Sequence, residues 1–263
     1  MTYKDRRPTV NDVRFNDIVA SLKAGVKDFR RAPVFGLCLA GIYVLGGWFL
    51  FTLLNFFDLP YFAYPLAVGF ALVAPFVAMG FYAVSSHLEN GSAPSWSWIL
   101  SKTRDASRRD IRWMALVTCF ALIIWMDIAA ILSFFFIGFN GFGVDFFETI
   151  FTTSSGLIFL LLGNFVGALI SIFIFSITVV SFPMLFDRDV DFITAMITSV
   201  RVVKSNPLSM IVWCGTIGLA MGLSVATGLL GLFLVLPIVG HASWHLYRHA
   251  VGPSKAETTI AAA

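Results

Sequence analysis

Three imidazoles lie close together near the carboxyl end of the chain. His241 and His245 are four residues apart, and His249 follows one turn later. Residues four apart share one face of a helix, so this pair has the spacing to ligate zinc or a haem iron. A closed zinc site needs four ligands, however, and no CxxCH haem-attachment motif is present. We therefore expect no metal site and no bound cofactor; a haem held by His241 and His245 is the alternative.

The residues between these histidines offer a simpler interpretation. Trp244, Tyr247 and Arg248 are residue types that hold a helix end among lipid headgroups. An interfacial belt of this kind accounts for the histidines without a ligand. His87, the fourth histidine, lies at the end of another apolar segment and has the same two interpretations.

A group of carboxylates follows the segment that contains Pro183. Asp187, Arg188 and Asp189 are consecutive, and Asp191 follows two positions after Asp189. Carboxylate oxygens at this density suit a divalent cation such as magnesium. A helix N-cap together with local ion pairs explains the same cluster with fewer assumptions.

Asp127 is the one acidic residue deep inside an apolar segment. An ionised carboxylate at such a depth is costly unless it is paired or protonated. It is either a protonated group bonded to a hydroxyl or amide, such as that of Asn164, or part of a path for protons or cations. The two interpretations stay open at this point.

The sequence lacks the common catalytic and nucleotide-binding signatures. There is no Walker loop, GxSxG, HExxH or dinucleotide fingerprint. The three cysteines, Cys38, Cys119 and Cys214, stand singly in apolar segments and are expected to serve packing. We therefore expect a protein that is not an enzyme.

The elements that position these residues are membrane helices. Of 263 residues, 58% are hydrophobic and only 13% are charged, whereas soluble domains average about 25% charged residues. One bilayer-spanning helix needs about 20 mostly apolar residues. The pattern predicts an all-α membrane protein with six transmembrane helices in three hairpins, each preceded by a short cytoplasmic interfacial amphipathic helix.

The boundaries follow from where the polar segments begin and end. Polar segments with an interfacial helix are expected at 1–33, 86–112 and 183–206, and a polar tail at 248–263. Helix pairs are expected at 34–85, 113–182 and 207–247. All 18 Lys and Arg residues fall in the polar segments. Because cytoplasmic loops collect basic residues, we expect both termini in the cytoplasm.

Each polar segment contains a helix-compatible stretch with basic residues toward its end. Such helices lie in the headgroup plane and attract anionic lipids. The basic residues expected at the headgroups are Arg30, Arg31, Arg108, Arg109 and Lys204. The basic charge is thus explained by membrane lipids, and a nucleic-acid partner is not expected.

The polar segments also suggest a threefold internal repeat of interfacial helix plus hairpin. Aligning Pro33 with Pro207 places Asp17 over Asp191 and Arg30 over Lys204. Repeats of this kind are typical of stacked structural units.

Three phrases of the sequence resemble a bacterial integral-membrane family, domain of unknown function family 2189. They are PFVAMGFY at 75–82 with HLENG at 87–91, SFPMLFDRD at 181–189, and PIVGHASWHLYR at 237–248. The resemblance extends from about Asp17 to Val251 and implies a membrane fold without a known reaction. Some relatives carry names that mention a cytochrome c oxidase subunit, which implies an accessory or assembly role beside a respiratory complex.

Three functions follow from these observations. The first is a non-catalytic inner-membrane protein that acts through lipid and protein contacts, with subunits of a respiratory complex as partners. The second is a transporter of a small solute or ion that uses Asp127. The third is a haem- or quinone-binding redox protein that uses His241 and His245.

Overall fold

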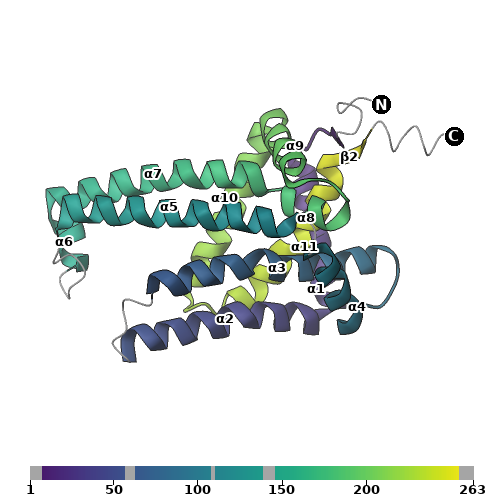
Figure 1. Ribbon diagram of the computed structural model, residues 1–263, viewed down its shortest axis with the longest axis horizontal. Helices are drawn as coiled ribbons and strands as arrows, with labels where there is room; N and C mark the ends of the chain where they lie inside the picture. Colours follow the sequence, from purple (N-terminus) through teal and green to yellow (C-terminus); the bar gives the residue numbers. More distant parts are fainter. Residues whose placement is uncertain (1–7, 57–62, 108–109, 139–145, 255–263) are drawn as a thin grey trace.

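The computed structural model describes residues 8–56, 63–107, 110–138 and 146–254. The fold is mostly helical, and both described ends of the chain lie at the same end of the molecule (Figure 1). The expected Arg108 and Arg109 headgroup residues lie outside the described residues, as does Asp145.

The first third of the chain forms a short helix followed by two long ones. These are α1 (Phe15–Arg31), α2 (Pro33–Phe56) and α3 (Ala63–Glu89). α2 begins at a proline, where a missing N–H costs little. Asp17 accepts a hydrogen bond from the Arg14 amide at 2.7 Å, which fixes the start of α1.

The middle third contains the helix pair that reaches furthest from the two termini in Figure 1. α4 (Trp96–Ser107) precedes α5 (Ile111–Ile137), and the short α6 (Phe146–Thr152) leads into α7 (Ser154–Thr178). α5 and α7 pack side by side. The sequence predicted only an irregular connection where α6 forms.

The last third begins with a break that the sequence did not predict. The second helix of the pair expected at 113–182 ends at Thr178, and a separate helix, α8 (Ser181–Asp187), follows it. Pro183 falls in the first turn of α8, where it has no helical N–H bond to lose; within an uninterrupted α7 its ring would meet the carbonyl of Val179. The chain then forms α9 (Phe192–Ser205), α10 (Pro207–Ala226) and α11 (Leu232–Ala250).

Two strands at the ends of the chain pair with each other. β1 (Pro8–Val10) and β2 (Val251–Ser254) are antiparallel, with Val10 opposite Val251. The sequence predicted a polar segment and a tail here, because three or four residues are too few to show an alternating pattern. The pairing places both described ends on the same side of the molecule.

Four stretches of the described chain are long and apolar enough to cross a membrane. They are Pro33–Thr52, Ile111–Ile137, Ser154–Asp187 and Pro207–Ala226. α3 and α11 occupy the places of the other two predicted spans, but α11 is rich in polar side chains. The predicted count of six spans and the threefold repeat therefore remain predictions.

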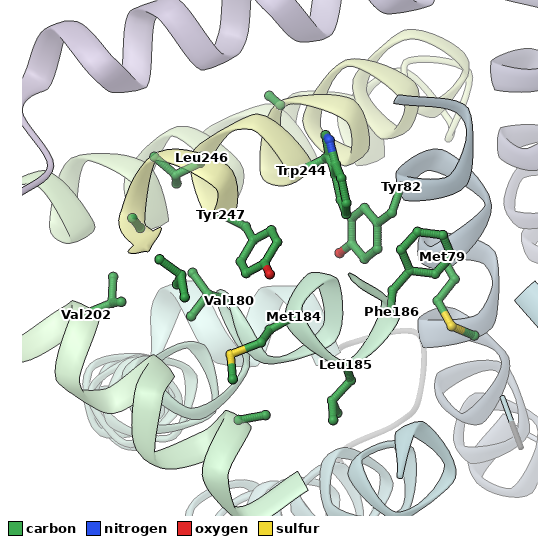
Figure 2. Close-up of a cluster of buried hydrophobic side chains, with 14 of the residues drawn as sticks. Met79, Tyr82, Val180, Met184, Leu185, Phe186, Val202, Trp244, Leu246 and Tyr247 are labelled. Carbon is green, nitrogen blue, oxygen red and sulfur yellow. The ribbon is translucent and has the colours of Figure 1, made fainter. Parts of the chain in front are cut away.

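The best-packed region is the end of the molecule near the termini, where α8 is inserted between α3, α9 and α11. Figure 2 shows Met79 and Tyr82 of α3 and Trp244 of α11 around Phe186 of α8. Trp244, Phe186 and Tyr82 form a chain of aromatic contacts with ring centroids 5.9 to 6.4 Å apart. Interiors of this density tolerate little change in volume.

α1 lies directly against α11, and a glycine sets the distance between them. A Cβ at Gly25 would lie 2.6 Å from the Ile238 carbonyl oxygen and 2.8 Å from the Ala242 nitrogen. Both atoms belong to the backbone of α11, so neither can move without shifting the helix. The side chains of α1 on this face are Ile18, Ser21 and Asp28, all buried.

Gly25→Ala should therefore destabilise the protein, by about 1–3 kcal/mol of overpacking that outweighs the gain of about 1 kcal/mol in helix propensity. The measurement is thermal unfolding of the full chain in detergent. Gly163→Ala in α7 is the matched control, because a Cβ there meets no atom within 4 Å. An unchanged transition temperature for Gly25→Ala would contradict the close approach.

Candidate functional site

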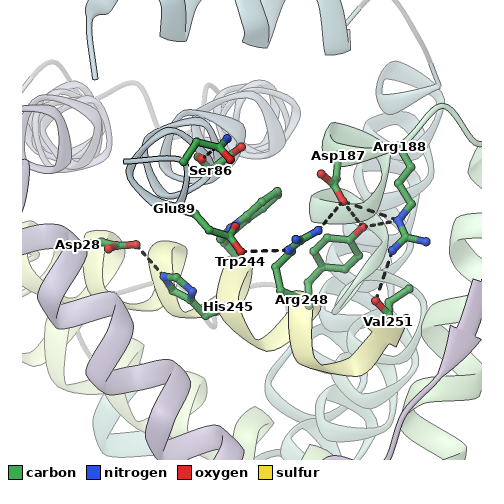
Figure 3. A network of polar contacts seen from close by, with 11 residues as sticks. Asp28, Ser86, Glu89, Asp187, Arg188, Trp244, His245, Arg248 and Val251 are labelled. Carbon is green, nitrogen blue, oxygen red and sulfur yellow. Dashed lines mark hydrogen bonds and ion pairs between the residues drawn. The ribbon is translucent and has the colours of Figure 1, made fainter. Parts of the chain in front are cut away.

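Five of the polar residues singled out in the sequence, Asp187, Arg188, His241, His245 and Arg248, meet at the end of the bundle near the termini. They and their partners come from the last turns of α3, from α8 and its following residues, and from the last turns of α11, with α1 packed alongside (Figure 3). On α11, His241, Trp244, His245 and Arg248 recur at helical spacing. We call the bonded side chains at this place the polar cluster: Asp28, Ser85, Glu89, Asp187, Arg188, His241, Trp244, His245, Tyr247 and Arg248.

Asp28 and His245 form an ion pair between α1 and α11. Their Oδ2 and Nε2 atoms are 2.7 Å apart, and Asp28 is 5% exposed. Burial by itself raises the pKa of Asp28, but hydrogen bonds from His245 and Ser85 and attraction by the His245 and His241 imidazoles hold this pKa below its ordinary value of 3.8. The carboxylate is thus kept ionised where it joins two helices.

His241 lies one turn before His245 and is fully buried. Its Nδ1 atom is 2.8 Å from the hydroxyl oxygen of Ser85 on α3, and the ring meets the edge of Phe81 at 5.5 Å. Nε2 has no hydrogen-bond partner among the described residues. His241 therefore joins α11 to α3, as His245 joins α11 to α1.

The next turn of α11 bonds to the end of α3. Trp244 donates its indole N–H to Glu89 at 3.1 Å, and Arg248 forms an ion pair with the same carboxylate at 3.4 Å. Arg248 also reaches Asp187 at 3.6 Å and lies over the Trp244 ring at 5.9 Å. One arginine thus links the carboxylates that end α3 and α8.

Tyr247 and Arg188 continue these contacts to the carboxyl end of the chain. The Tyr247 hydroxyl donates to Asp187 at 2.7 Å and accepts from Nε of Arg188 at 2.9 Å. Arg188 also donates to the carbonyls of Gly252 at 2.9 Å and Val251 at 3.4 Å. These bonds fasten β2 against α8.

The prediction of an interfacial belt at the lipid headgroups is wrong for Trp244 and Tyr247. Trp244 and Tyr247 are 1% and 0% exposed, so both pack inside the protein. Arg248 stays partly exposed but is held by Glu89 and Asp187. The physical reason is that both ring-bearing side chains find hydrogen-bond acceptors inside the protein, which lets their polar tips be buried.

His87 and His249 lie outside the polar cluster. His87 stacks on Trp98 with ring centroids 4.1 Å apart, which joins α3 to α4. His249 is exposed, and its backbone carbonyl accepts a bond from the Asn11 side chain at 2.9 Å. The four histidines therefore do not converge on one ligand.

The carboxylates after α8 have separate structural partners. Asp187 bonds to Tyr247, whereas Asp191 accepts from the Thr194 amide at 2.8 Å and its hydroxyl at 2.6 Å, which caps α9. Within the part of the chain that the structure describes, no three His, Cys, Asp or Glu side chains are grouped to hold a metal ion. Asp189 is exposed between them.

Asn164 lines a cavity between α5 and α7, and Asp127 does not. This cavity has a volume of about 480 Å³ and is also lined by Trp125 and Ala129, and the Asn164 amide donates to the Leu160 carbonyl at 2.7 Å. Asp127 follows Trp125 by two residues, so the helical register turns it by about 200° from this cavity. Asp127 is exposed on the opposite side of α5.

Two further cavities border the membrane helices and α1. One of about 450 Å³ lies among α3, α5, α7 and α10 and includes Tyr82, Thr118 and Trp213. Another lies on the outer face of α1, beside the exposed Arg30 and Arg31. Lys204 is exposed on α9. None of these three cavities is lined by His241 or His245.

The geometry of the polar cluster is that of a structural joint. Its charged groups bond to one another across α1, α3, α8 and α11, and the imidazoles that suggested haem are held by Ser85 and Asp28. Asp28 and Ser85 were not identified from the sequence. The spacing of Ser21, Gly25 and Asp28 on one face of α1 was the available signal.

Arg188→Ala should loosen the carboxyl end of the chain, because the variant loses the bonds to Tyr247, Gly252 and Val251. We expect a loss of about 1–3 kcal/mol in unfolding free energy and faster hydrogen exchange at the amides of Thr9, Val10, Val251, Gly252 and Ser254. Arg104→Ala, an exposed position on α4, is the control. Unchanged exchange in the Arg188 variant would show that these bonds do not hold β2.

Substitutions at Asp191 distinguish its role as the cap of α9 from a role as a magnesium ligand. Burial by itself raises the pKa of Asp191, but the hydrogen bonds from the Thr194 hydroxyl and from backbone amides together hold this pKa below its ordinary value of 3.8. Asp191→Ala should cost about 1 kcal/mol, fully present above about pH 4 and lost as the pH falls through the lower pKa of the folded state. Asp191→Asn should keep most of the cap. Thermal unfolding of both variants with and without magnesium checks this, and a magnesium-dependent loss in the Asn variant would contradict the cap.

Part of the chain matches a known protein family. Residues 63–187 match a family described as "Predicted integral membrane protein (DUF2189)". No curated protein and no solved structure matches significantly. The match runs from the start of α3 to the end of α8 and includes the first phrase and residues 181–187 of the second, while the phrase at 237–248 lies outside it. The resemblance is thereby confirmed over residues 63–187, and the chain is an integral membrane protein with helices able to span the bilayer.

Proposed function

We propose that this protein is a non-catalytic membrane protein that acts through contacts with lipids and with other proteins. The observation that carries the proposal is that the charged groups and the exposed apolar side chains of the protein lie in different regions. The charged side chains of the polar cluster bond to one another, whereas the long helices keep their large apolar side chains outward. Groups already engaged in mutual bonds are poorly placed for acid–base or nucleophilic chemistry.

The apolar surface is concentrated on the α5–α7 pair. On α7, Leu161 is 75% exposed, and Phe165 and Leu169 follow on the same face of the helix. In a bilayer such a face meets either lipid chains or the helices of another protein. The far end of the pair reaches beyond the other helices in Figure 1.

For the protein partner we propose subunits of a respiratory complex such as cytochrome c oxidase, beside which the protein would serve as an accessory or assembly factor. This part rests on the names of relatives in the resembled family. The exposed apolar side chains of this chain support only the type of interface, in which helices pack against helices within the membrane.

Affinity purification of the tagged full chain in mild detergent tests the proposal. Mass spectrometry of the eluate should find respiratory-complex subunits, and an absorption spectrum should show no haem that purifies with the chain alone. Leu161→Ala with Phe165→Ala on α7 should reduce recovery of the partner. Leu219→Ala with Leu223→Ala, equally exposed on α10, should not. A stoichiometric haem spectrum without any partner would overturn the proposal in favour of a redox protein.

The proposed location is the inner membrane of a bacterium with both termini cytoplasmic. In a chain whose Cys38, Cys119 and Cys214 are replaced by Ser, single cysteines at Lys102 and Glu148 should differ in their reaction with an impermeant thiol reagent on intact cells. The cysteine at Lys102, on the cytoplasmic side, should be protected from the reagent by the membrane, and the cysteine at Glu148 should be labelled. Labelling at Lys102 and protection at Glu148 would invert the topology.

The alternative function is a transporter that uses Asp127. Because Asp127 lies on the face of α5 away from the cavity shared with α7, we expect Asp127→Asn to leave expression, thermal stability in detergent and partner recovery nearly unchanged. Asp127→Leu is the companion variant that also removes the bonding atoms. Proton-coupled flux in proteoliposomes of the unmodified protein, absent from the Asn variant, would replace our proposal with the transporter.

A further inference from the structure

A groove runs along the outer side of α1 where this helix meets α11. Its volume is about 590 Å³, and it is lined by α1 together with Ile238 of α11. The face of α1 that packs on α11 carries Ile18, Gly25 and Asp28, so the groove belongs to the side of α1 that the protein leaves uncovered.

The groove has an apolar floor and a cationic rim. Val19, Leu22 and Val26 are half-buried and adjoin Ile238. The rim consists of four exposed cationic side chains at helical spacing: Lys23, Lys27, Arg30 and Arg31. Among the residues that the structure describes, no Asp or Glu lines this groove. Four like charges on two turns of helix repel one another unless an anion lies among them.

The position of the groove relative to the membrane follows from the next helix. α1 ends at Arg31, and the apolar stretch able to cross the membrane begins at Pro33. Arg30 and Arg31 are therefore at the level where α2 enters the bilayer. In Figure 1, α1 lies at the end of the bundle beside the start of α2.

These features select the chemistry of the occupant. The cations suit a phosphodiester anion, and arginine in particular binds phosphate oxygens in pairs. Free phosphate or a nucleic-acid backbone would leave the apolar floor exposed to water. A phospholipid satisfies both parts, because its headgroup meets the rim while an acyl chain covers the floor.

We propose that this groove is a binding site for an anionic phospholipid of the phosphatidylglycerol class. The proposal deepens the proposed function, since it assumes that the chain works in a membrane, and it names the lipid that holds α1 at the membrane surface. The phosphate lies among Lys23, Lys27, Arg30 and Arg31, and an acyl chain lies along Val19, Leu22, Val26 and Ile238.

Native mass spectrometry of the full chain in detergent tests the site with dioleoyl-phosphatidylglycerol and dioleoyl-phosphatidylcholine as probes. The phosphatidylglycerol adduct should be retained at least fivefold better than the phosphatidylcholine adduct. The variant Lys23→Gln, Lys27→Gln, Arg30→Gln, Arg31→Gln should lose this preference. The control Lys102→Gln, Arg104→Gln, Arg112→Gln, Lys204→Gln removes four exposed cations elsewhere and should retain it.

Two further arms identify the occupant and check the fold. Val26→Glu places a carboxylate on the floor and should weaken the phosphatidylglycerol adduct while all four cations remain. Millimolar inorganic phosphate should leave the adduct in place. The thermal unfolding of each variant in lipid-free detergent should match that of the unmodified chain. If Val26→Glu unfolds at a lower temperature, Val26→Gln takes its place.

Three results would overturn the proposal. They are equal retention of both lipids, equal losses in the groove variant and the control, and displacement of the lipid by phosphate. Each of these three results is independent of which protein partner the affinity purification recovers. A chain that binds phosphatidylglycerol in the groove but recovers no respiratory subunit would refute the proposed partner and leave the lipid site standing.

Discussion

A buried carboxylate bonded to an imidazole joins the first helix of the chain to the last. Asp28 and His245 are separated by 217 positions in the sequence and by 2.7 Å in space. The contact is possible only because Gly25 lets α1 approach the backbone of α11. Once α1 and α11 are in place, His241, Trp244 and Arg248 face α3, and Tyr247 faces α8. The ion pair and the glycine thus position the polar cluster.

The need to bond polar groups explains why this end of the molecule is so tightly organised. α11 carries three histidines and an arginine on a helix that packs against α1, α2, α3 and α10. Buried polar groups cost free energy unless they find partners. Successive turns of α11 bond to side chains on α1, α3 and α8, which fixes these three helices around it. The α5–α7 pair makes no comparable set of polar bonds in the described chain, and its apolar surface remains available for lipid or another protein.

Some of this arrangement was predictable from the sequence, because the signals are local. Apolar length and the placement of lysine and arginine predicted the helices near their observed positions, including the starts of α2 and α10 at Pro33 and Pro207. The break before α8 was missed although Pro183 marks it, since the apolar composition continues across Val179 and Val180. The β1–β2 pairing was missed because its two short strands come from opposite ends of the chain.

The polar cluster was predictable only in part. The residues of α8 and α11 were identified from their chemistry, but their partners Asp28 and Ser85 lie in segments that composition describes only as polar or apolar. The belt interpretation of Trp244 and Tyr247 failed because an amphipathic ring suits a membrane surface and a protein interior equally well. Tertiary contacts decide between the two, and the sequence pattern does not contain them.

The central claim is that the charged groups at this end serve the fold as bonded pairs. A double-mutant cycle of Asp28→Asn and His245→Gln, followed by equilibrium unfolding in detergent, tests it most directly. We predict that each single variant is destabilised and that the double variant loses less than the total of the two, with a coupling of about 0.5–3 kcal/mol. Strictly additive losses, or single variants as stable as the unmodified chain, would contradict the account.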